Sequence, residues 1–247
     1  MPGPANQQVT VVDVRESGSR YVPELYHKVM VPSFAPDELE TEEELVRGLR
    51  SGRSRVLVAV GTDGDVLGGA VGEYFPLSQV MLLAYLAVLP GGRGGGVGST
   101  VLQAARDAWT AELSPRLIVL EVEDPRDFAG SEAFGDPVAR VRFYERHGGR
   151  ALPLPYVQPA LGPDTARVPG LMLMAFGNDE PSAAGAVDGR HVASFLAEYF
   201  EEFEGAARPG DTELELLLSA CAWPGGLPLL TIDELPSTAE RGNIPWL

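Results

Sequence analysis

A glycine-rich segment at residues 91–98 constrains the fold of this 247-residue chain more than any other feature. It contains six glycines, follows the apolar run 80–89 and precedes a helical pattern at residues 101–109. The unpaired amides in the first turn of a helix and the helix dipole attract negative charge, and glycines let the backbone approach a phosphate closely. The order of strand, glycine-rich loop and helix therefore predicts an anion-binding site.

The spacing within this loop argues against two common phosphate-binding motifs. A P-loop places a lysine directly before its serine or threonine, and residues 91–98 contain no lysine. The dinucleotide-binding pattern needs glycine at its last position, which is Val97 when counted from Gly92 and Ser99 when counted from Gly94. Neither a nucleotide hydrolase nor a Rossmann dehydrogenase is therefore favoured.

The loop does resemble another phosphate-binding sequence. Val88, Pro90, Arg93, Gly96 and Gly98 have the spacing V-x-P-x-x-R-x-x-G-x-G. This pattern is similar to the acyl-CoA pyrophosphate loop of the GNAT superfamily of N-acetyltransferases. The resemblance implies an acyl-CoA-dependent N-acetyltransferase that uses acetyl-CoA as its co-substrate.

A second block downstream supports the same family. The sequence Leu-Glu-Val at residues 120–122 resembles the fifth strand of the family, and residues 139–149 resemble its fourth helix. That helix typically ends in Tyr-x-x-x-Gly, which here is Tyr144 and Gly148. The resemblance covers residues 8–177 and departs from the family at Pro137, where many members have an asparagine that contacts the cofactor.

The resemblance assigns acetyl-CoA binding to the loop and to the strand before it. Loop amides would hold the pyrophosphate, and backbone groups of the strand would pair with the pantetheine arm as an added strand does. The expected cofactor-binding residues are Leu86, Ala87 and Val88 in the strand, and Arg93, Gly94, Gly95, Gly96, Val97, Gly98 and Ser99 in the loop.

Glu121 is the leading candidate for the base that deprotonates the amine. It interrupts the apolar run 117–120, and a carboxylate within such a strand is costly unless it is paired or used. Related enzymes often use a glutamate at this Leu-Glu-Val position. Strand alternation places Glu123 on the same face, where it could act as the base instead or bind the substrate ammonium. The alternative interpretation is that both carboxylates lie at an exposed strand end.

Two tyrosines complete the candidate site. In the family, a tyrosine at the position of Tyr144 points at the CoA sulfur and can protonate the leaving thiolate. The alternative interpretation is that Tyr144 is an ordinary aromatic residue of the core. Tyr85, inside the apolar strand 80–88, is a weaker candidate for contacting the substrate. Core packing is the interpretation that the sequence favours for Tyr85.

The expected secondary structure has an α+β order. Strands are predicted at residues 8–14, 55–60, 66–74, 80–88, 117–123, 151–155 and 170–176, and helices at 21–31, 41–49, after the loop and at 137–148. Thr41 and Glu44 form a capping-box pattern, and Asp136 followed by Pro137 is typical of a helix start. This order predicts a mixed, mainly antiparallel sheet flanked by helices, the GNAT-like fold that the resemblance also implies.

The composition changes after residue 177, and residues 177–188 are typical of a linker. Residues 192–203 carry an aromatic and aliphatic stripe at helical spacing, and residues 214–222 form a second expected helix. We therefore predict a GNAT-like acetyltransferase domain at residues 1–177 and a linker with a C-terminal helical extension at 178–247. The extension would pack on the main domain as extra core, or serve as a lid or dimer arm.

The net charge and the cysteine content limit the kinds of molecule that this protein is expected to bind. The formal net charge of −16 argues against binding to nucleic acid and would attract a cationic amine, although acidity also maintains solubility. One cysteine permits no internal disulfide, nothing resembles a signal peptide or a membrane span, and no Cys/His cluster indicates a metal. We expect a soluble, cytoplasmic protein without metal or membrane partner, and a homodimer stays open.

The leading functional hypothesis is transfer of an acetyl group from acetyl-CoA to a primary amine of a small cationic molecule. Two alternatives stay open: a protein lysine or N-terminal acetyltransferase, which an open groove would favour, and a non-catalytic acyl-CoA sensor. The acidic segment at residues 37–40 could attract an amine, although a solvated lead-in to the helix is the favoured interpretation.

Overall fold

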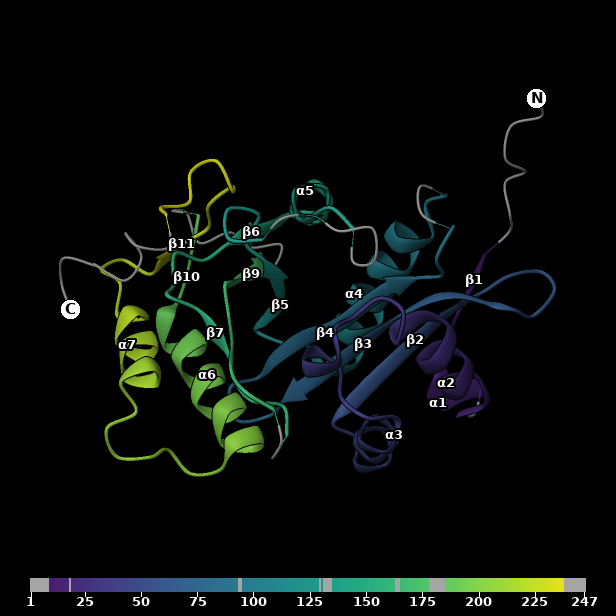
Figure 1. Ribbon diagram of the computed structural model, residues 1–247, viewed down its shortest axis with the longest axis horizontal. Coiled ribbons are helices and arrows are strands. Elements are labelled where there is room, and N and C mark those ends of the chain that lie inside the picture. The colour runs from purple at the N-terminus through teal and green to yellow at the C-terminus, as the bar shows by residue number, and fades with distance from the viewer. Residues whose placement is uncertain are drawn as a thin grey trace. The chain divides into compact units, whose positions relative to one another are not determined.

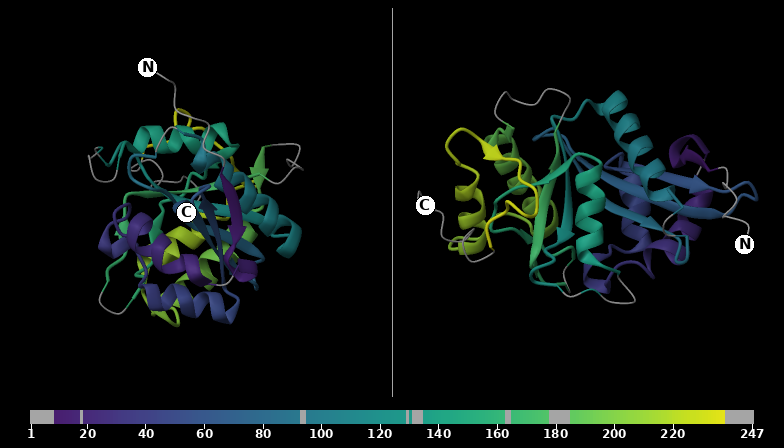
Figure 2. Two further views of the ribbon diagram at one scale, coloured as in Figure 1. Left: turned by 90° about the vertical axis from the view of Figure 1, so that its right-hand side faces the viewer. Right: turned by 90° about the horizontal axis from the view of Figure 1, so that it is seen from above.

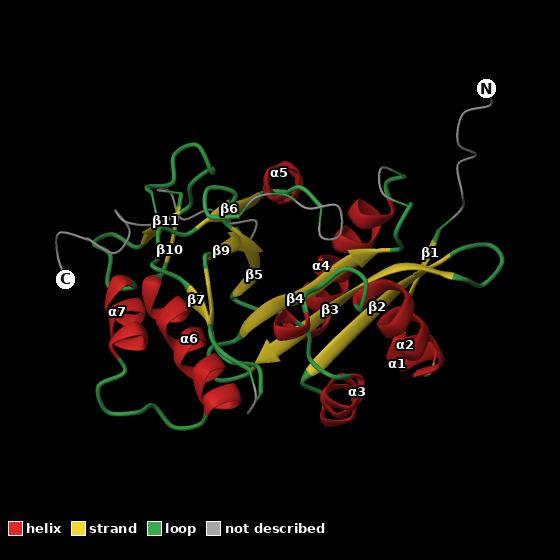
Figure 3. Cartoon of the chain, in the orientation of Figure 1, coloured by secondary structure: helices red, strands yellow, loops and turns green. Residues whose placement is uncertain are grey.

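The computed structural model describes residues 9–17, 19–92, 95–128, 130, 135–162, 165–177 and 185–237. Its chain forms two compact units, Met1–Tyr74 with Leu83–Ser114 and Phe75–Leu82 with Pro115–Leu247. Mainly antiparallel strands flanked by helices make up the structure, as the sequence predicts (Figures 1 and 3).

The first unit contains strands in the order β1-β2-β3-β4. β2 pairs antiparallel with both β1 and β3. The predicted helix at residues 21–31 is divided into a short α-helix and a wider π-helical segment. The elements are β1 (Thr10–Asp13), α1 (Val14–Ser17), η1 (Ser19–Tyr21), α2 (Val22–Glu24), η2 (Leu25–Met30), η3 (Pro36–Glu38), α3 (Glu42–Ser51), β2 (Ser54–Val60), β3 (Val66–Phe75), β4 (Val80–Val88), which starts in the second unit, and α4 (Val97–Leu113).

Helices cover both faces of this sheet. On one face, Leu25 of η2 and Leu45 of α3 join a buried cluster with Val58 of β2. Side chains alternate along a strand, so Arg55 of β2 faces the other side, where it forms an ion pair with Glu112 of α4 at 2.9 Å. α4 therefore covers the face opposite η2 and α3 (Figure 2). The expected capping box of α3 is confirmed.

The second unit contains the strand order β5-β9-β6, in which β9 pairs antiparallel with both neighbours. The strand expected at residues 151–155 is wrong: it ends at Ala151, because Pro153 and Pro155 have no N–H to donate to a ladder. The elements are β5 (Leu117–Glu123), α5 (Pro137–Arg146), β6 (Gly149–Ala151), β7 (Val157–Gln158), β8 (Val168–Pro169), β9 (Leu171–Phe176), β10 (Ala186–Val187), α6 (Gly189–Glu204), α7 (Thr212–Ala220) and β11 (Leu227–Pro228).

The C-terminal extension packs within the second unit. α6 and α7 lie side by side (Figures 1 and 2), and the apolar stripe of α6, including Phe195 and Phe200, is buried. Leu230 exchanges backbone hydrogen bonds with Ala151 at the end of β6, at 2.8 and 3.0 Å. These contacts make residues 185–237 an ordered part of the second unit, while the domain boundary at residue 177 stays a prediction.

Candidate active site

The glycine-rich loop leads into a helix N-terminus that no side chain caps. Gly96 is the N-cap residue of α4 and has a φ of 81°, a left-handed conformation that residues with a Cβ rarely adopt. In an α-helix the amides of the first turn, here Val97, Gly98 and Ser99, have no partner within the helix. This end of α4 therefore fits an anion such as the pyrophosphate of acetyl-CoA.

The other loop residues differ in their contacts and in whether the structure describes them. The hydroxyl of Thr100 donates a hydrogen bond to the carbonyl oxygen of Gly96 at 3.1 Å, so it stabilises the helix start. Gly95 is exposed. Arg93 and Gly94, to which the resemblance assigns cofactor contacts, lie outside the described residues. The assignment of the loop residues to acetyl-CoA stays a prediction.

The end of β4, assigned to the pantetheine arm, lies close to β3. Ala87 is buried, whereas Leu86 and Val88 are half-buried. A Cβ placed on Gly68 of β3 would lie 2.7 Å from the carbonyl oxygen of Ala87, which is closer than real Cβ contacts. Glycine at position 68 thus sets how closely the two strands approach at the predicted cofactor position.

Tyr85 holds the segment before α3. Its side chain is buried, and its hydroxyl accepts a hydrogen bond from the backbone N–H of Glu40 at 3.0 Å. Its ring meets Phe34 edge to face, with ring centroids 5.0 Å apart. These contacts are those of a core residue, so the contact between Tyr85 and the substrate stays a prediction.

Glu40 is buried, and the favoured interpretation of residues 37–40 as a solvated lead-in is wrong at this position. Its side chain is 4% exposed and lies 3.5 Å from the guanidinium of Arg53, which also contacts Glu73 at 3.2 Å. Burial first, and the charge of Glu73 second, raise the pKa of Glu40 to about 8. The reason is tertiary: Tyr26 and Tyr85 hydrogen-bond the backbone of Glu40 and draw it inward.

Glu121 is the centre of a hydrogen-bond network in the second unit. The hydroxyl of Tyr156 donates to its Oε1, and Nε2 of Gln158 donates to its Oε2 at 2.8 Å. The hydroxyl of Tyr199, on α6, lies 3.3 Å from Oε2 and 3.5 Å from Oε1. Burial and the negative charge of Glu121 raise the pKa of Tyr156 well above its usual value, so Tyr156 keeps the proton that it donates.

Glu123 lies two residues further along β5 and is ion-paired. Its Oε2 is 2.8 Å from Nη1 of Arg140 on α5. The cation neutralises this carboxylate, whereas the hydrogen-bond donors around Glu121 described above carry no charge. Both glutamates are half-buried, which does not match an exposed strand end. Which of the two glutamates accepts a proton from a substrate ammonium stays a prediction.

Tyr144 lies on α5, which begins at Asp136 and Pro137 as the sequence predicts. Its side chain is 7% exposed and its ring packs edge to face against Phe143 and Phe176. Burial raises the pKa of Tyr144 to about 12, so the phenol is protonated at neutral pH. Within the described part of the chain, its hydroxyl has no hydrogen-bond partner, which leaves that proton available to an acceptor from outside.

The predicted residues are distributed over the two units. The loop and Leu86–Val88 belong to the first unit, and Glu121, Glu123 and Tyr144 belong to the second. In the described residues no hydrogen bond joins Glu121 to Tyr144.

Three side chains at Glu121 were not predicted from the sequence: Tyr156, Gln158 and Tyr199. Tyr156 and Gln158 follow two prolines, and the sequence around them shows no clear periodicity. A polar Gln158 in a buried stretch was the available signal. Tyr199 was assigned only to the apolar stripe of α6, because helical spacing predicts its face and not the partner of its hydroxyl.

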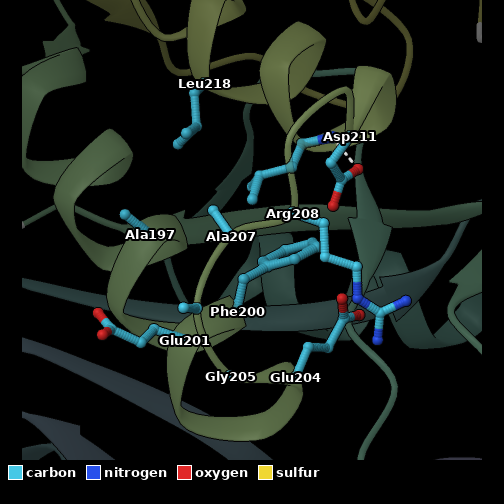
Figure 4. Close-up of a pocket in the computed structure, with 11 residues that line it drawn as sticks. Ala197, Phe200, Glu201, Glu204, Gly205, Ala207, Arg208, Asp211 and Leu218 are labelled. Atoms are coloured by element: carbon cyan, nitrogen blue, oxygen red, sulfur yellow. Dashed lines mark hydrogen bonds between the residues drawn. The ribbon is translucent and has the colours of Figure 1, made fainter.

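A cavity of about 200 Å³ lies between α6 and α7. Figure 4 shows Phe200, Glu204 and Asp211 around it. Arg167 holds both of these carboxylates, at 2.6 Å from Glu204 and 2.5 Å from Asp211. The predicted site residues do not line this cavity.

In the described part of the chain, no group of three or more His, Cys, Asp or Glu side chains could hold a metal ion. Among the described residues, no helix has the length and apolar character needed to cross a membrane. Cys221 is buried, which raises the pKa of its thiol to about 12 and suits a packing residue better than a nucleophile.

The glycine-rich loop before the uncapped N-terminus of α4 and the mainly antiparallel sheet are features of an acyl-CoA-dependent acetyltransferase. The family model described as the acetyltransferase (GNAT) family matches residues 21–148. Because this match covers more than half of the chain, the protein belongs to the GNAT acetyltransferase family, whose enzymes are acyl-CoA-dependent N-acetyltransferases.

Individual proteins are similar to this chain in structure or over part of the sequence. A GNAT-family protein from Bacteroides thetaiotaomicron has a structure similar to this chain, with a TM-score of 0.52 and 24% identity over 78% of this chain and 98% of that one. A spermidine N-acetyltransferase from Vibrio cholerae has a TM-score of 0.47 and 16% identity over 68% of this chain and 92% of that one. Streptothricin acetyltransferase from Streptomyces lavendulae is 41% identical over 54 residues, which span 22% of this chain and 29% of that protein.

Proposed function

We propose that this protein transfers an acetyl group from acetyl-CoA to a primary amine of a small cationic molecule. The observation that carries the proposal is the carboxylate of Glu121, which is half-buried in β5 and accepts hydrogen bonds from Tyr156 and Gln158, with the hydroxyl of Tyr199 at 3.3 Å. Hydrogen bonds donated to a carboxylate favour its charged form, and a charged carboxylate attracts an ammonium group and can accept its proton.

Each candidate residue has a defined part in this reaction. Acetyl-CoA supplies the thioester whose acetyl group is transferred. The first-turn amides of α4 hold its pyrophosphate. Glu121 takes one proton from the substrate ammonium, which frees the nitrogen lone pair for attack on the thioester carbonyl. Tyr144, protonated at neutral pH, gives one proton to the sulfur as the carbon–sulfur bond breaks. The new amide nitrogen then loses its second proton, which returns to the phenolate of Tyr144, and Glu121 releases its proton to solvent.

A small substrate is favoured over a protein because the C-terminal extension occupies space beside the proposed base. Tyr199 of α6 contacts the carboxylate of Glu121, and an extended polypeptide would need an open groove there. The net charge of −16 favours a cationic acceptor. The partial match to a streptothricin acetyltransferase supports the same class of substrate.

The test is release of CoA from acetyl-CoA in the presence of a panel of amines. The panel contains streptothricin, a linear polyamine, a lysine-containing peptide and a peptide with a free N-terminus. We expect turnover with a small polycation, and its loss in E121Q with acetyl-CoA binding unchanged. Turnover confined to the peptides would instead indicate a protein acetyltransferase. Acetyl-CoA binding without turnover on any amine would indicate a sensor.

A further inference from the structure

Tyr199 is held rigidly on the inner face of α6. Its side chain is 2% exposed. The ring centroids of Phe75 and Phe195 each lie 5.4 Å from that of Tyr199, and the centroid of Phe203 lies 5.3 Å from it. Because aromatic rings surround the phenol, its hydroxyl can extend in few directions, and it lies against both carboxylate oxygens of Glu121.

Glu198, the residue before Tyr199, anchors α6 next to Tyr199. The carboxylate of Glu198 accepts hydrogen bonds from the backbone N–H groups of Leu77 at 3.0 Å and Ser78 at 2.9 Å. It also accepts one from the hydroxyl of Ser78 at 2.8 Å. Hydrogen bonds to an ionised acceptor are stronger than neutral ones, so this cluster fixes the position of α6 where Tyr199 reaches β5.

The carboxylate of Glu121 is contacted by donors from two segments, the hydroxyl of Tyr199 on α6 and the side chains of Tyr156 and Gln158. Tyr156 donates to one oxygen of Glu121, Gln158 donates to the other, and Tyr199 lies between the two oxygens. An ionised carboxylate can only accept hydrogen bonds. Each donor therefore stabilises the charged form and restricts rotation of the carboxylate about its last torsion.

We propose that Tyr199 is a positioning residue of the acetyltransferase. Its hydroxyl keeps the carboxylate of Glu121 in the orientation that receives the proton of the substrate, so the C-terminal extension is part of the active site. The inference rests on the proposed function of Glu121 as the base. Tyr199 acts only through Glu121 and does not contact the reacting atoms.

Y199F removes the hydroxyl and keeps the ring in its aromatic cluster. We expect kcat to fall by about three- to tenfold, the range of one hydrogen bond, with KM for acetyl-CoA unchanged. The acidic limb of the kcat/KM profile should move to higher pH because the ionised carboxylate has lost a donor. The titratable groups facing this carboxylate include Tyr156 from the β7 segment, and Glu123 on the same strand is paired with Arg140.

E198Q is the matched control, because it weakens the anchoring of α6 and keeps the hydroxyl of Tyr199 that Y199F removes. We expect E198Q to lower Tm and to leave the pH profile at its wild-type position. Y199F should show the opposite pattern, a shifted profile with Tm nearly unchanged. If Y199F and E198Q instead lost activity in proportion to their loss of Tm, Tyr199 would be merely structural and the inference would be overturned.

A second measurement needs neither turnover nor an identified amine. In protein labelled with ¹³C at the glutamate carboxyl carbons, the signal of Glu121 is assigned from its absence in E121Q and followed against pH. Its midpoint should rise in Y199F by about half a pH unit or more, and an unchanged midpoint would overturn the inference. Failure of the proposed function has a different signature: E121Q would keep full activity. In the E121Q background, adding Y199F should have no further effect on turnover.

Discussion

The hydroxyl of Tyr156 donates a hydrogen bond to the carboxylate of Glu121, a residue 35 positions earlier in the chain. The phenol is buried, and its pKa is raised well above the usual value partly by the charge of Glu121. The phenol of Tyr156 therefore keeps its proton and donates it in a hydrogen bond, which favours the charged form of the carboxylate. Such a carboxylate is ready to receive a proton from an ammonium ion rather than to donate one.

E121Q and E123Q distinguish the two candidate bases. E121Q removes the proton acceptor, so kcat should fall by about a hundredfold or more, the usual contribution of a general base. E123Q removes the partner of Arg140 and should lower turnover by less than about tenfold, mainly through a displaced α5. Steady-state kinetics of both variants, with acetyl-CoA binding measured separately, checks this. A larger loss in E123Q would make Glu123 the base.

Y144F tests the proposed acid with little effect on the fold. The hydroxyl of Tyr144 has no hydrogen-bond partner in the described residues, so its removal should change Tm by no more than about 1–2 °C. Turnover should nevertheless fall by about tenfold to a hundredfold, because the leaving thiolate loses its proton donor. Thermal unfolding and kinetics are measured on the same preparation. Lost stability with unchanged kcat would show a structural tyrosine.

G68A tests whether the approach of β3 to β4 sets the cofactor position. The added methyl group would lie 2.7 Å from the carbonyl oxygen of Ala87, so β3 and β4 must move apart where the pantetheine arm is expected. We expect the Kd for acetyl-CoA, measured by calorimetry, to rise at least about tenfold, the effect of roughly 1.4 kcal/mol. G61A is the control, because the atom nearest to its Cβ would be Cδ1 of Leu67 at 3.4 Å. Equal Kd values for both variants would contradict this role.

The buried carboxyl of Glu40 predicts a pH dependence of stability. Its pKa of about 8 lies above the value of 4.5 for an exposed glutamate, so the folded state binds the additional proton between these limits. The contribution of Glu40 to stability is fully present below pH 4.5 and is lost as the pH rises through 8, at up to about 1.4 kcal/mol per pH unit.

Urea unfolding of the wild type, E40Q and E43Q at pH 5 to 8 checks this dependence. The stability of E40Q relative to the wild type should rise with pH, because glutamine has no proton to lose. E43Q changes an exposed glutamate nearby and should follow the wild type. Parallel curves for E40Q and the wild type would show that Glu40 is ionised throughout.

The sequence by itself determined the local structure and the family. Periodicity places β4 and β5, and local capping patterns at Thr41 and Asp136 place the starts of α3 and α5, because their partners lie within a few residues. The glycine loop is equally local, since its conformation and the uncapped amides of α4 depend on consecutive residues. The strand predicted at residues 151–155 is wrong. Its apolar residues favour a strand, but its two prolines cannot donate backbone hydrogen bonds to a neighbouring strand.

Only the tertiary structure decided what surrounds the reactive groups. The sequence could assign Glu121 to a strand, but Tyr156, Gln158 and Tyr199 reach its carboxylate from segments 35 to 78 residues away. Likewise, the burial of Glu40 depends on Tyr85 in a distant strand. Hydrogen bonds between segments far apart in the chain carry no periodic signal, because they arise when hydrophobic burial packs the elements together and leaves each buried polar group to find a partner.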